Sequence, residues 1–374
     1  MSAERANPLR SAHFLAAALW AGLVVLPSAS FCQQTRATET AIDGPASLAI
    51  SSDRYLFVAS LYENNVRRID LQSGTAETVA GNGKGCCYRE YAKAKDVSLG
   101  DVWSLAVNSQ GDIFIAEDTR VLKVDAQTGL ISTVAGDGKT TNTDDGLPAL
   151  STSFRQIWGL AFDRDDNLFI ADRSRGAIFR LDRTGRIFRF AGDDGNQGFR
   201  GDGGPALAAR FQFVGSIAFD HSGNLLIADE GNCRLRRVDH DTGTIQTVFE
   251  TEPIVACAKE QIGNWALPSP TDFVVDPDGN IVFLETAMNV MRRFDLESNT
   301  LSDIAGNGTR GFGGDGSAAS QATLSAPSGL AIRSNGDLFI SDTTNNRVRR
   351  VDARTKKIQT VVGNGLPNVI HGEE

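Results

Sequence analysis

The stretch Arg350-Val351-Asp352 ends a run of strand-forming residues, and the same order of a basic residue, an apolar residue and an aspartate occurs six times. The six copies are Arg68-Ile69-Asp70, Lys123-Val124-Asp125, Arg180-Leu181-Asp182, Arg237-Val238-Asp239, Arg293-Phe294-Asp295 and Arg350-Val351-Asp352. Neighbouring aspartates are separated by 55, 57, 57, 56 and 57 residues. A period this regular indicates one supersecondary unit repeated six times between residues 44 and 365.

Each repeat predicts four short strands. In the last copy, residues 329–332 and 338–341 flank an Asn335-Gly336 turn, which is a strong hairpin signal, and residues 348–351 and 358–362 form the next pair. Four antiparallel strands per repeat, with a period in the mid-fifties, predict an all-β fold, a six-bladed β-propeller with four antiparallel strands per blade. The alternative, an open β-solenoid, would have much shorter coils.

The loops of such a propeller fall into two sets. The first-to-second and third-to-fourth turns of every blade are short and share one face, which we call the tight-turn face. The second-to-third turns and the blade-to-blade connections share the opposite face, which we call the loop face. The long connections are residues 82–101, 137–156, 193–212, 250–269 and 307–326. Long loops on a rigid scaffold are usually where binding occurs, so we expect the loop face to carry function.

Residues 1–30 have the features of a secretory signal peptide. Arg5 and Arg10 precede an apolar stretch at residues 13–26, which is too short to span a membrane, and small residues follow at 28–30. The alternative is a buried N-terminal helix. We expect the mature protein to be exported, periplasmic or extracellular, and monomeric. Residues 31–43 are then a segment that helps to close the ring, and residues 366–374 are a tail.

The chain is acidic, with a formal net charge of −9. Residues 1–30 hold two basic residues and one acidic residue, so the mature chain would carry −10. An acidic domain repels phosphate backbones, and no stretch rich in lysine or arginine stands out. We therefore expect no nucleic acid partner.

Four cysteines follow Cys32, and an even count in an exported protein favours disulfides. Cys233 lies in the second-to-third turn of blade four, and Cys257 lies in the connection that leaves this blade. We predict a disulfide between these two. Cys86 and Cys87 would form a vicinal pair or remain reduced. None of the spacings is typical of a zinc site.

Several segments strongly resemble NHL repeats. They are residues 338–352 and 225–229 within the blades, and residues 191–205 and 305–316 between blades. The resemblance covers residues 44–365 and implies an NHL-repeat propeller of the exported bacterial type, with a more distant likeness to the lactonase-like propellers. NHL propellers include protein-binding modules, RNA-binding modules and a few enzymes, so the resemblance implies a fold more than a function.

The four histidines do not fit a catalytic centre. His13 lies in the signal and His371 in the tail, while His221 and His240 fall in tight turns. The NHL-type lyases that the chain resembles group several histidines around zinc, and that arrangement needs histidines on the loop face. A three-histidine zinc site and a serine–histidine–acid triad on that face are both excluded.

A lactonase-like enzyme would instead need carboxylates that converge on calcium. One set ends the second strand: Ser60, Glu117, Asp172, Asp229, Glu285 and Asp342. Turn chemistry favours structural caps for this set. The other set begins the innermost strand: Ser47, Ser104, Gly159, Ser216, Asp272 and Gly329. Only Asp272 can ionise there, so we expect no metal and no cofactor.

Tryptophans break the repeat pattern at the loop face. Trp103 and Trp158 precede the innermost strands of blades two and three, and Trp265 lies in the connection between blades four and five. The other copies have Ala46, Gly215, Thr271 and Ser328 at the position of the first two. Flat aromatic surfaces suit stacking on sugars or anchoring a peptide. The alternative is that the tryptophans fill gaps between blades.

The sequence therefore favours an exported, non-catalytic recognition propeller that binds a protein, peptide or glycan on its loop face. The candidate ligand-binding residues are Trp103, Trp158, Trp265, Asp272, Glu117 and Glu285. The alternative is a calcium-dependent hydrolase of the lactonase or esterase type. Missing histidines and an innermost ring with one carboxylate favour the first hypothesis.

Overall fold

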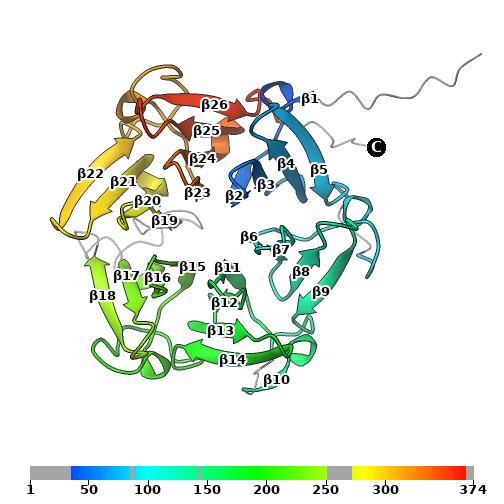
Figure 1. Cartoon of the computed structure of the whole chain (residues 1–374), viewed down its shortest axis with the longest axis vertical. Helices are drawn as coiled ribbons and strands as arrows, with labels where there is room; N and C mark the ends of the chain where they lie inside the picture. The colour runs from blue at the N-terminus through cyan, green and yellow to red at the C-terminus, as the bar shows by residue number, and fades with distance from the viewer. Residues whose placement is uncertain (1–34, 85–87, 142–144, 251–271, 368–374) are drawn as a thin grey trace, which may run out of the picture. The chain divides into compact units, whose positions relative to one another are not determined.

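The computed structural model describes residues 35–84, 88–141, 145–250 and 272–367. All of them belong to the unit Gln34–Glu374. Within this unit, six antiparallel sheets are arranged in a ring around a central axis (Figure 1). The predicted six-bladed propeller is confirmed.

In each blade, four strands follow one another outward in chain order. Blades one and two consist of β2 (Pro45–Ser51), β3 (Tyr55–Ser60), β4 (Asn65–Asp70), β5 (Thr75–Ala80), β6 (Ser104–Val107), β7 (Ile113–Ala116), β8 (Val121–Val124) and β9 (Ile131–Ala135). Blades three and four consist of β11 (Ile157–Phe162), β12 (Leu168–Asp172), β13 (Ala177–Leu181), β14 (Arg186–Ala191), β15 (Val214–Phe219), β16 (Leu225–Asp229), β17 (Arg234–Val238) and β18 (Ile245–Glu250). Blades five and six consist of β19 (Phe273–Val275), β20 (Ile281–Glu285), β21 (Val290–Asp295), β22 (Thr300–Ala305), β23 (Leu330–Ile332), β24 (Leu338–Asp342), β25 (Arg347–Val351) and β26 (Ile358–Val362).

Short segments complete the architecture. The strands β1 (Thr35–Arg36) and β10 (Leu147–Pro148) pair with the outermost strands β5 and β14. The helical elements of the described residues are 3-10 turns: η1 (Ala37–Glu39), η2 (Ala94–Asp96), η3 (Ala149–Ser151), η4 (Ala206–Ala208), η5 (Glu230–Asn232), η7 (Thr286–Met288), η8 (Ala319–Gln321) and η9 (Thr343–Asn345). Within the described ranges, no helix has the length and apolar character needed to cross a bilayer.

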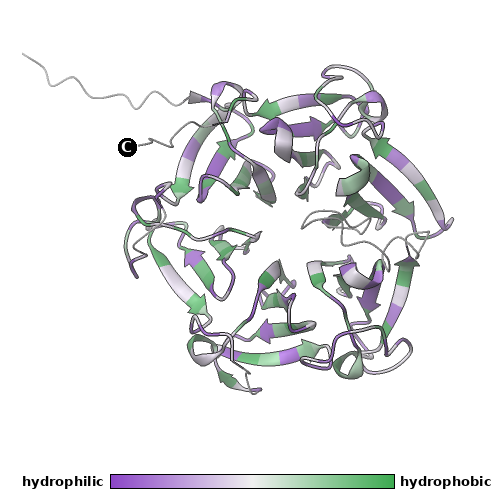
Figure 2. Ribbon diagram, turned by 180° about the vertical axis from the view of Figure 1, so that it is seen from behind, coloured by the Kyte–Doolittle hydropathy of each residue, from purple (hydrophilic) through white to green (hydrophobic). Residues whose placement is uncertain are grey.

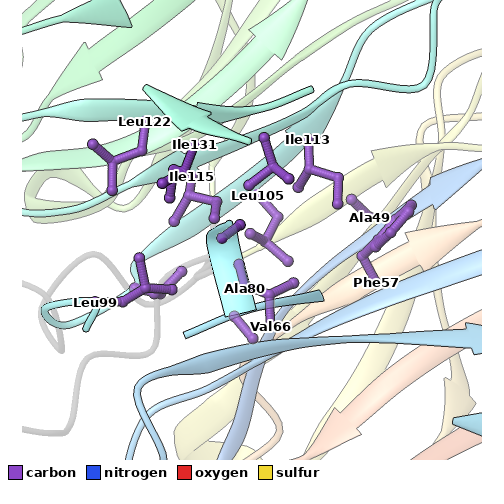
Figure 3. Packing of buried hydrophobic residues seen from close by; sticks show 14 of the residues in the cluster. Ala49, Phe57, Val66, Ala80, Leu99, Leu105, Ile113, Ile115, Leu122 and Ile131 are labelled. Atoms are coloured by element: carbon purple, nitrogen blue, oxygen red, sulfur yellow. The ribbon is translucent and has the colours of Figure 1, made fainter. Parts of the chain in front are cut away.

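The hydrophobic core lies between neighbouring blades. Phe57 and Val66 of blade one pack in one cluster with Leu105, Ile113 and Ile115 of blade two (Figure 3). The outermost strands have mixed hydropathy because one of their faces meets solvent (Figure 2). Each second strand is packed on both faces, which accounts for its unbroken run of apolar residues.

The aspartate of the repeated motif shapes the turn that follows it. Asp70 Oδ1 accepts hydrogen bonds from the backbone N–H groups of Gln72 and Ser73, at 2.8 and 3.2 Å. The aspartates of the other five copies accept backbone N–H groups in the same turn. The motif that reveals the repeat is therefore an Asx-type turn between the third and fourth strands.

The described blade-to-blade joints share one pair of backbone hydrogen bonds. Each joint centres on a buried alanine of a 3-10 turn: Ala37, Ala94, Ala149, Ala206 or Ala319. The alanine carbonyl accepts an N–H, at 2.9 to 3.0 Å, from the glycine after the preceding blade's outermost strand: Gly363, Gly81, Gly136, Gly192 or Gly306. The alanine N–H donates to the third-to-fourth turn of the following blade. The joint between blades four and five lies outside the described residues.

Only glycine fits the donor position of these joints. The five glycines have φ between 82° and 99°, a region that side chains disfavour. A Cβ atom on Gly136 would collide with the carbonyl oxygen of Thr119, and the other four would meet an equivalent carbonyl oxygen. This explains why the outermost strand so often ends in Ala-Gly.

The ring closes through the same joint. The carbonyl of Ala37 accepts the N–H of Gly363 at 2.9 Å, and the N–H of Ala37 donates to Gly74 at 2.9 Å. Ile42 is fully buried in the cluster that joins blades six and one. The N–H of Gly44 donates to Asn346 Oδ1 at 3.0 Å. Residues 35–44 thus form with blades six and one the same pair of backbone hydrogen bonds that the connections form at the other described joints.

Gly136→Ala is expected to lower the free energy of unfolding by at least about 2 kcal/mol, because the residue must leave the left-handed region and break the joint. Gly129→Ala in the same blade is the matched control. Its φ is 68°, but apart from Gly129 itself and its two chain neighbours no residue has an atom within 4 Å of its Cβ position, so we expect a loss of about 1 kcal/mol. Urea unfolding compares the two variants. Equal losses would contradict the role given to the joint.

Candidate functional site

Two rings of residues lie at the loop-face end of the innermost strands. The first ring holds Ala46, Trp103, Trp158, Gly215 and Ser328, with Thr271 outside the described residues. The second ring holds the residue that follows each second-strand acid or its equivalent: Leu61, Asp118, Arg173, Glu230, Thr286 and Thr343. In blade six the two rings meet through a hydrogen bond of 2.7 Å between the hydroxyls of Ser328 and Thr343. The large aromatic and the charged members of the two rings belong to blades two, three and four, whereas the described members in the other blades are small, aliphatic or uncharged.

The two tryptophans stack on each other across the boundary between blades two and three. Their ring centroids are 5.0 Å apart and the planes differ by 20°. Both side chains are half-buried. The indole N–H of Trp103 donates to Asp118 Oδ1 at 2.7 Å, whereas the indole N–H of Trp158 is buried without a hydrogen-bond partner in the described chain. The pair therefore fills the gap between blades and also keeps part of its surface in solvent.

Arg173 joins the tryptophan pair to blade four. Its guanidinium carbon lies 3.7 Å from the centroid of the Trp158 ring and 5.2 Å from that of Phe213. The same guanidinium forms an ion pair with Glu230. The side chains of Arg173 and Glu230 are 14% and 3% exposed. A Cβ atom on Gly215 would collide with Glu230 Oε1, so the glycine of the first ring makes room for this carboxylate. We call the set of residues joined by these contacts the tryptophan region; it consists of Trp103, Asp118, Trp158, Arg173 and Glu230.

Burial dominates the electrostatics of this region. It raises the pKa of Glu230 to about 7, and the neighbouring charges of Asp272 and Asp229 add to the rise although Arg173 opposes it. Burial also raises the pKa of Asp272 to about 6, against the lowering effect of its hydrogen bonds. The pKa of Asp229 is raised to about 6, again chiefly by burial.

The candidate set at the start of the innermost strands forms hydrogen bonds between blades. The hydroxyl of Ser47 accepts the N–H of Leu105 at 2.9 Å, and the hydroxyl of Ser104 accepts the N–H of Leu160 at 3.1 Å. The two glycines of the set leave no room for a side chain, since a Cβ atom would meet the carbonyl of the neighbouring innermost strand. The set holds adjacent blades together at the axis.

Asp272 follows the same structural pattern. Its Oδ2 accepts the N–H of Leu330 in blade six at 2.7 Å, and its Oδ1 accepts the N–H of Phe273 at 3.0 Å. Ser216 of blade four adds a side-chain hydrogen bond. Asp272 therefore links blades four, five and six. It also interacts electrostatically with Glu230, which belongs to the tryptophan region.

The acids that end the second strands have the geometry of caps. In four blades the carboxylate accepts a backbone N–H from the residue 17 positions earlier, which belongs to the incoming connection. The pairs are Gly100–Glu117, Arg155–Asp172, Gln212–Asp229 and Ser325–Asp342, at 2.7 or 2.8 Å. The candidate ligand residues Glu117 and Glu285 are buried, and each forms an ion pair of 2.8 Å, with Arg120 and Arg292 respectively.

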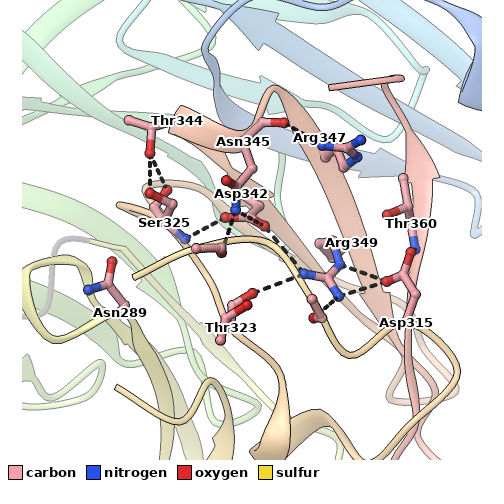
Figure 4. Close-up of polar contacts among 12 residues, drawn as sticks. Asn289, Asp315, Thr323, Ser325, Asp342, Thr344, Asn345, Arg347, Arg349 and Thr360 are labelled. Atoms are coloured by element: carbon pink, nitrogen blue, oxygen red, sulfur yellow. Dashed lines mark hydrogen bonds and ion pairs between the residues drawn. The ribbon is translucent and has the colours of Figure 1, made fainter. Parts of the chain in front are cut away.

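The glycine-rich connections wrap around a buried arginine. In blade six, Arg349 donates to Asp315 and to the carbonyls of Thr323 and Gly313, and it approaches the cap Asp342 at 3.3 Å (Figure 4). Arg236 repeats this network in blade four. Because each guanidinium is fully buried and satisfied, the motif of residues 198–203 and 311–316 serves the fold.

The histidines and carboxylates that the structure describes do not form a metal site. His221 Nε2 lies 2.9 Å from the carbonyl oxygen of Asp276, and His240 Nδ1 lies 3.0 Å from Asp241, both in tight turns as predicted. Within the described ranges, no group of three or more His, Cys, Asp or Glu side chains is arranged to hold a metal ion. The described carboxylates that a calcium site would need are used as caps or as links between blades.

A separate cavity of about 530 Å³ opens along the axis. Its lining comes from the innermost strands and from Ser52 and Asp53 in a tight turn, and it includes Leu48, Leu105 and Leu160. None of the candidate site residues lines it. This cavity and the tryptophan region are therefore different places in the propeller.

Two candidates lie outside the described residues, namely Trp265 and the disulfide partner Cys257. Cys233 itself is fully buried at the end of η5, and its pairing stays a prediction. Sequence reasoning missed Asp118, Arg173 and Glu230. The sequence could have identified them, because the position after the second-strand acid varies in residue type from copy to copy instead of repeating.

Comparisons with known proteins agree with this architecture, although no family model matches the chain. The chain is 26% identical over 321 residues to Protein SUPPRESSOR OF QUENCHING 1, chloroplastic, of Arabidopsis thaliana, covering 84% of this chain and 25% of that protein. It is 24% identical over 332 residues to NHL repeat-containing protein 2 of Gallus gallus, covering 86% of this chain and 40% of that protein. The chain thus spans less than half the length of these relatives.

Solved structures share the fold alone. A selenomethionine-substituted virginiamycin B lyase from Staphylococcus aureus matches with a TM-score of 0.51 and 13% identity, covering 87% of this chain and 85% of that one. A calcium-binding protein, regucalcin, from Agrobacterium tumefaciens matches with a TM-score of 0.51 and 15% identity, covering 81% of this chain and 83% of that one. At such low identity, neither likeness carries a site across.

Glu230→Gln is expected to change how stability depends on pH. The pKa of Glu230 is raised from its ordinary 4.5 to about 7 in the folded protein, so the folded state holds this proton more tightly than the unfolded state. The resulting stabilisation is complete below about pH 4.5 and is lost as the pH rises through about 7. Between these limits, the wild type should lose up to about 3 kcal/mol relative to the variant.

Chemical denaturation at about pH 4.5 and about pH 8 measures this difference. Asp241→Asn is the control, because its side chain is 91% exposed and lies in a tight turn. If the free energy of unfolding depends on pH in the same way in the wild type and in Glu230→Gln, the pKa of Glu230 is not raised in the folded protein and the prediction is wrong.

Proposed function

We propose that this chain, a six-bladed propeller homologous to the NHL repeat-containing proteins, is a non-catalytic recognition module that binds a protein, peptide or glycan at the tryptophan region of its loop face. We also infer export from the signal-like residues 1–30. The stacked pair of Trp103 and Trp158 is the observation that carries the proposal.

The fold itself does not require indoles at this position. The same ring holds Ala46, Gly215 and Ser328 in other blades, and the joints between those blades use the same hydrogen bonds. A half-exposed aromatic pair on a rigid frame offers a large contact area whose shape is already set. Aromatic surface combined with a small number of placed polar groups is typical of a ligand site.

Binding without catalysis is supported by what surrounds the pair. Both described histidines lie on the tight-turn face. The carboxylates near the pair are held by Arg173, by backbone amides or by an indole. The hydrolase hypothesis would need these groups to be free to bind calcium or to activate water, and no described contact favours it over recognition.

Trp103→Ala and Trp158→Ala are each expected to weaken ligand capture by about 2 kcal/mol, or roughly 30-fold in Kd. Arrays of defined peptides and oligosaccharides supply the probes, and thermal unfolding reports whether the variants fold. Tyr62→Ala is the matched control, because Tyr62 is 60% exposed in a second-to-third turn on the same face. Capture that survives both tryptophan substitutions would exclude this region as the site.

Catalysis is tested directly with lactones and aryl esters. The recognition hypothesis expects no turnover in the presence of calcium, and no difference after a chelator is added. Hydrolysis that a chelator abolishes and that added calcium restores would replace recognition by the hydrolase hypothesis.

A further inference from the structure

Together with Asp272, the tryptophan region carries more negative than positive charge. Asp118, Glu230 and Asp272 contribute three carboxylates, and Arg173 is the cation that contacts one of them. In the described part of the chain, Asp118 and Asp272 accept hydrogen bonds from neutral donors and take part in no ion pair. A cationic ligand group would therefore be favoured at this end of the propeller.

Arg173 shows how the region accommodates a cation. Its guanidinium lies over the indole of Trp158 and pairs with the carboxylate of Glu230, the second-ring residue of the next blade. One step along the ring, Trp103 and Asp118 again bring an indole and a carboxylate together, in contact at 2.7 Å. Among the described residues, no arginine or lysine lies over Trp103 or pairs with Asp118. The second indole–carboxylate pair is thus left without a cation from the chain.

Two unpaired polar atoms reinforce the interpretation. Glu230 is 3% exposed, yet its Oε1 has no hydrogen-bond partner among the described residues. The buried indole N–H of Trp158 is also unpaired there. Buried polar atoms are nearly always paired, so exceptions call for an explanation. A ligand or ordered water bound beside the pair would supply the missing partners.

We propose that Trp103 and Asp118 bind a lysine or arginine side chain of a basic peptide. This inference rests on the proposed function. The indole face attracts the cation through its quadrupole, and the exposed carboxylate of Asp118 completes the pair, as Glu230 does for Arg173. The contacts Asp118–Trp103–Trp158–Arg173–Glu230 would then form one continuous arc in which charged groups flank the stacked indole pair at both ends. Acidic peptides would be repelled, and uncharged oligosaccharides would gain only the stacking.

The test titrates penta-lysine, penta-arginine and penta-glutamate into the full chain, with calorimetry as the readout. Asp118→Asn keeps an acceptor for the indole N–H and removes the charge, so it should weaken binding of both basic peptides at least tenfold. Asp165→Asn is the matched control. It removes the same charge from an 82% exposed side chain in a tight turn and should leave binding unchanged.

The outcomes separate the inference from the function on which it rests. Equal weakening by Asp118→Asn and Asp165→Asn would mean non-specific attraction to an acidic protein and would overturn the inference. Absent binding of both basic peptides, with tryptophan-dependent capture of neutral or acidic probes, would refute the ligand class and keep the recognition function. If no probe on the arrays depends on the tryptophans, both fail.

Discussion

The propeller depends on one type of backbone hydrogen bond, which recurs from blade to blade. In each described case the N–H of the glycine after an outermost strand donates to the alanine carbonyl in the next connection. At each described joint, this bond ties the outer edge of one blade to the segment that leads into the next. The glycine must adopt a positive φ and pass close to a carbonyl, which no other residue can do without strain. Trp103 and Trp158 belong to the neighbouring blades two and three, and their rings stack across the boundary between these blades.

Much of the fold could be predicted from the sequence because the repeat encodes local structure. The six aspartates repeat since each accepts backbone N–H groups of its own turn, a contact within a few residues that any copy must reproduce. The Ala-Gly ends of the outermost strands were visible as well. Their role was not, because the alanine that accepts the bond lies in a connection whose length and sequence vary between blades.

The candidate site was only partly predictable, for a physical reason. Tryptophans at a position where other blades have small residues drew attention to the region, and the structure places Trp103 and Trp158 in contact there. Arg173 and Glu230 could not be paired from sequence, because they lie 57 residues apart and meet only through the packing of two blades. Asp272 illustrates the opposite case: a lone carboxylate in a ring of serines and glycines looks functional, yet its oxygens bind the amides of Leu330 and Phe273. Contacts between repeats, rather than patterns within them, decide such roles.

Amide hydrogen exchange at Gly363 tests the central claim most directly, because this amide forms the joint that closes the ring. If all joints are equivalent, the amides of Gly363 and Gly136 should exchange only through global unfolding, with the same dependence on denaturant. A Gly363 amide that exchanges through local opening, with little dependence on denaturant while Gly136 stays protected, would show that residues 35–44 do not close the ring as the other connections do.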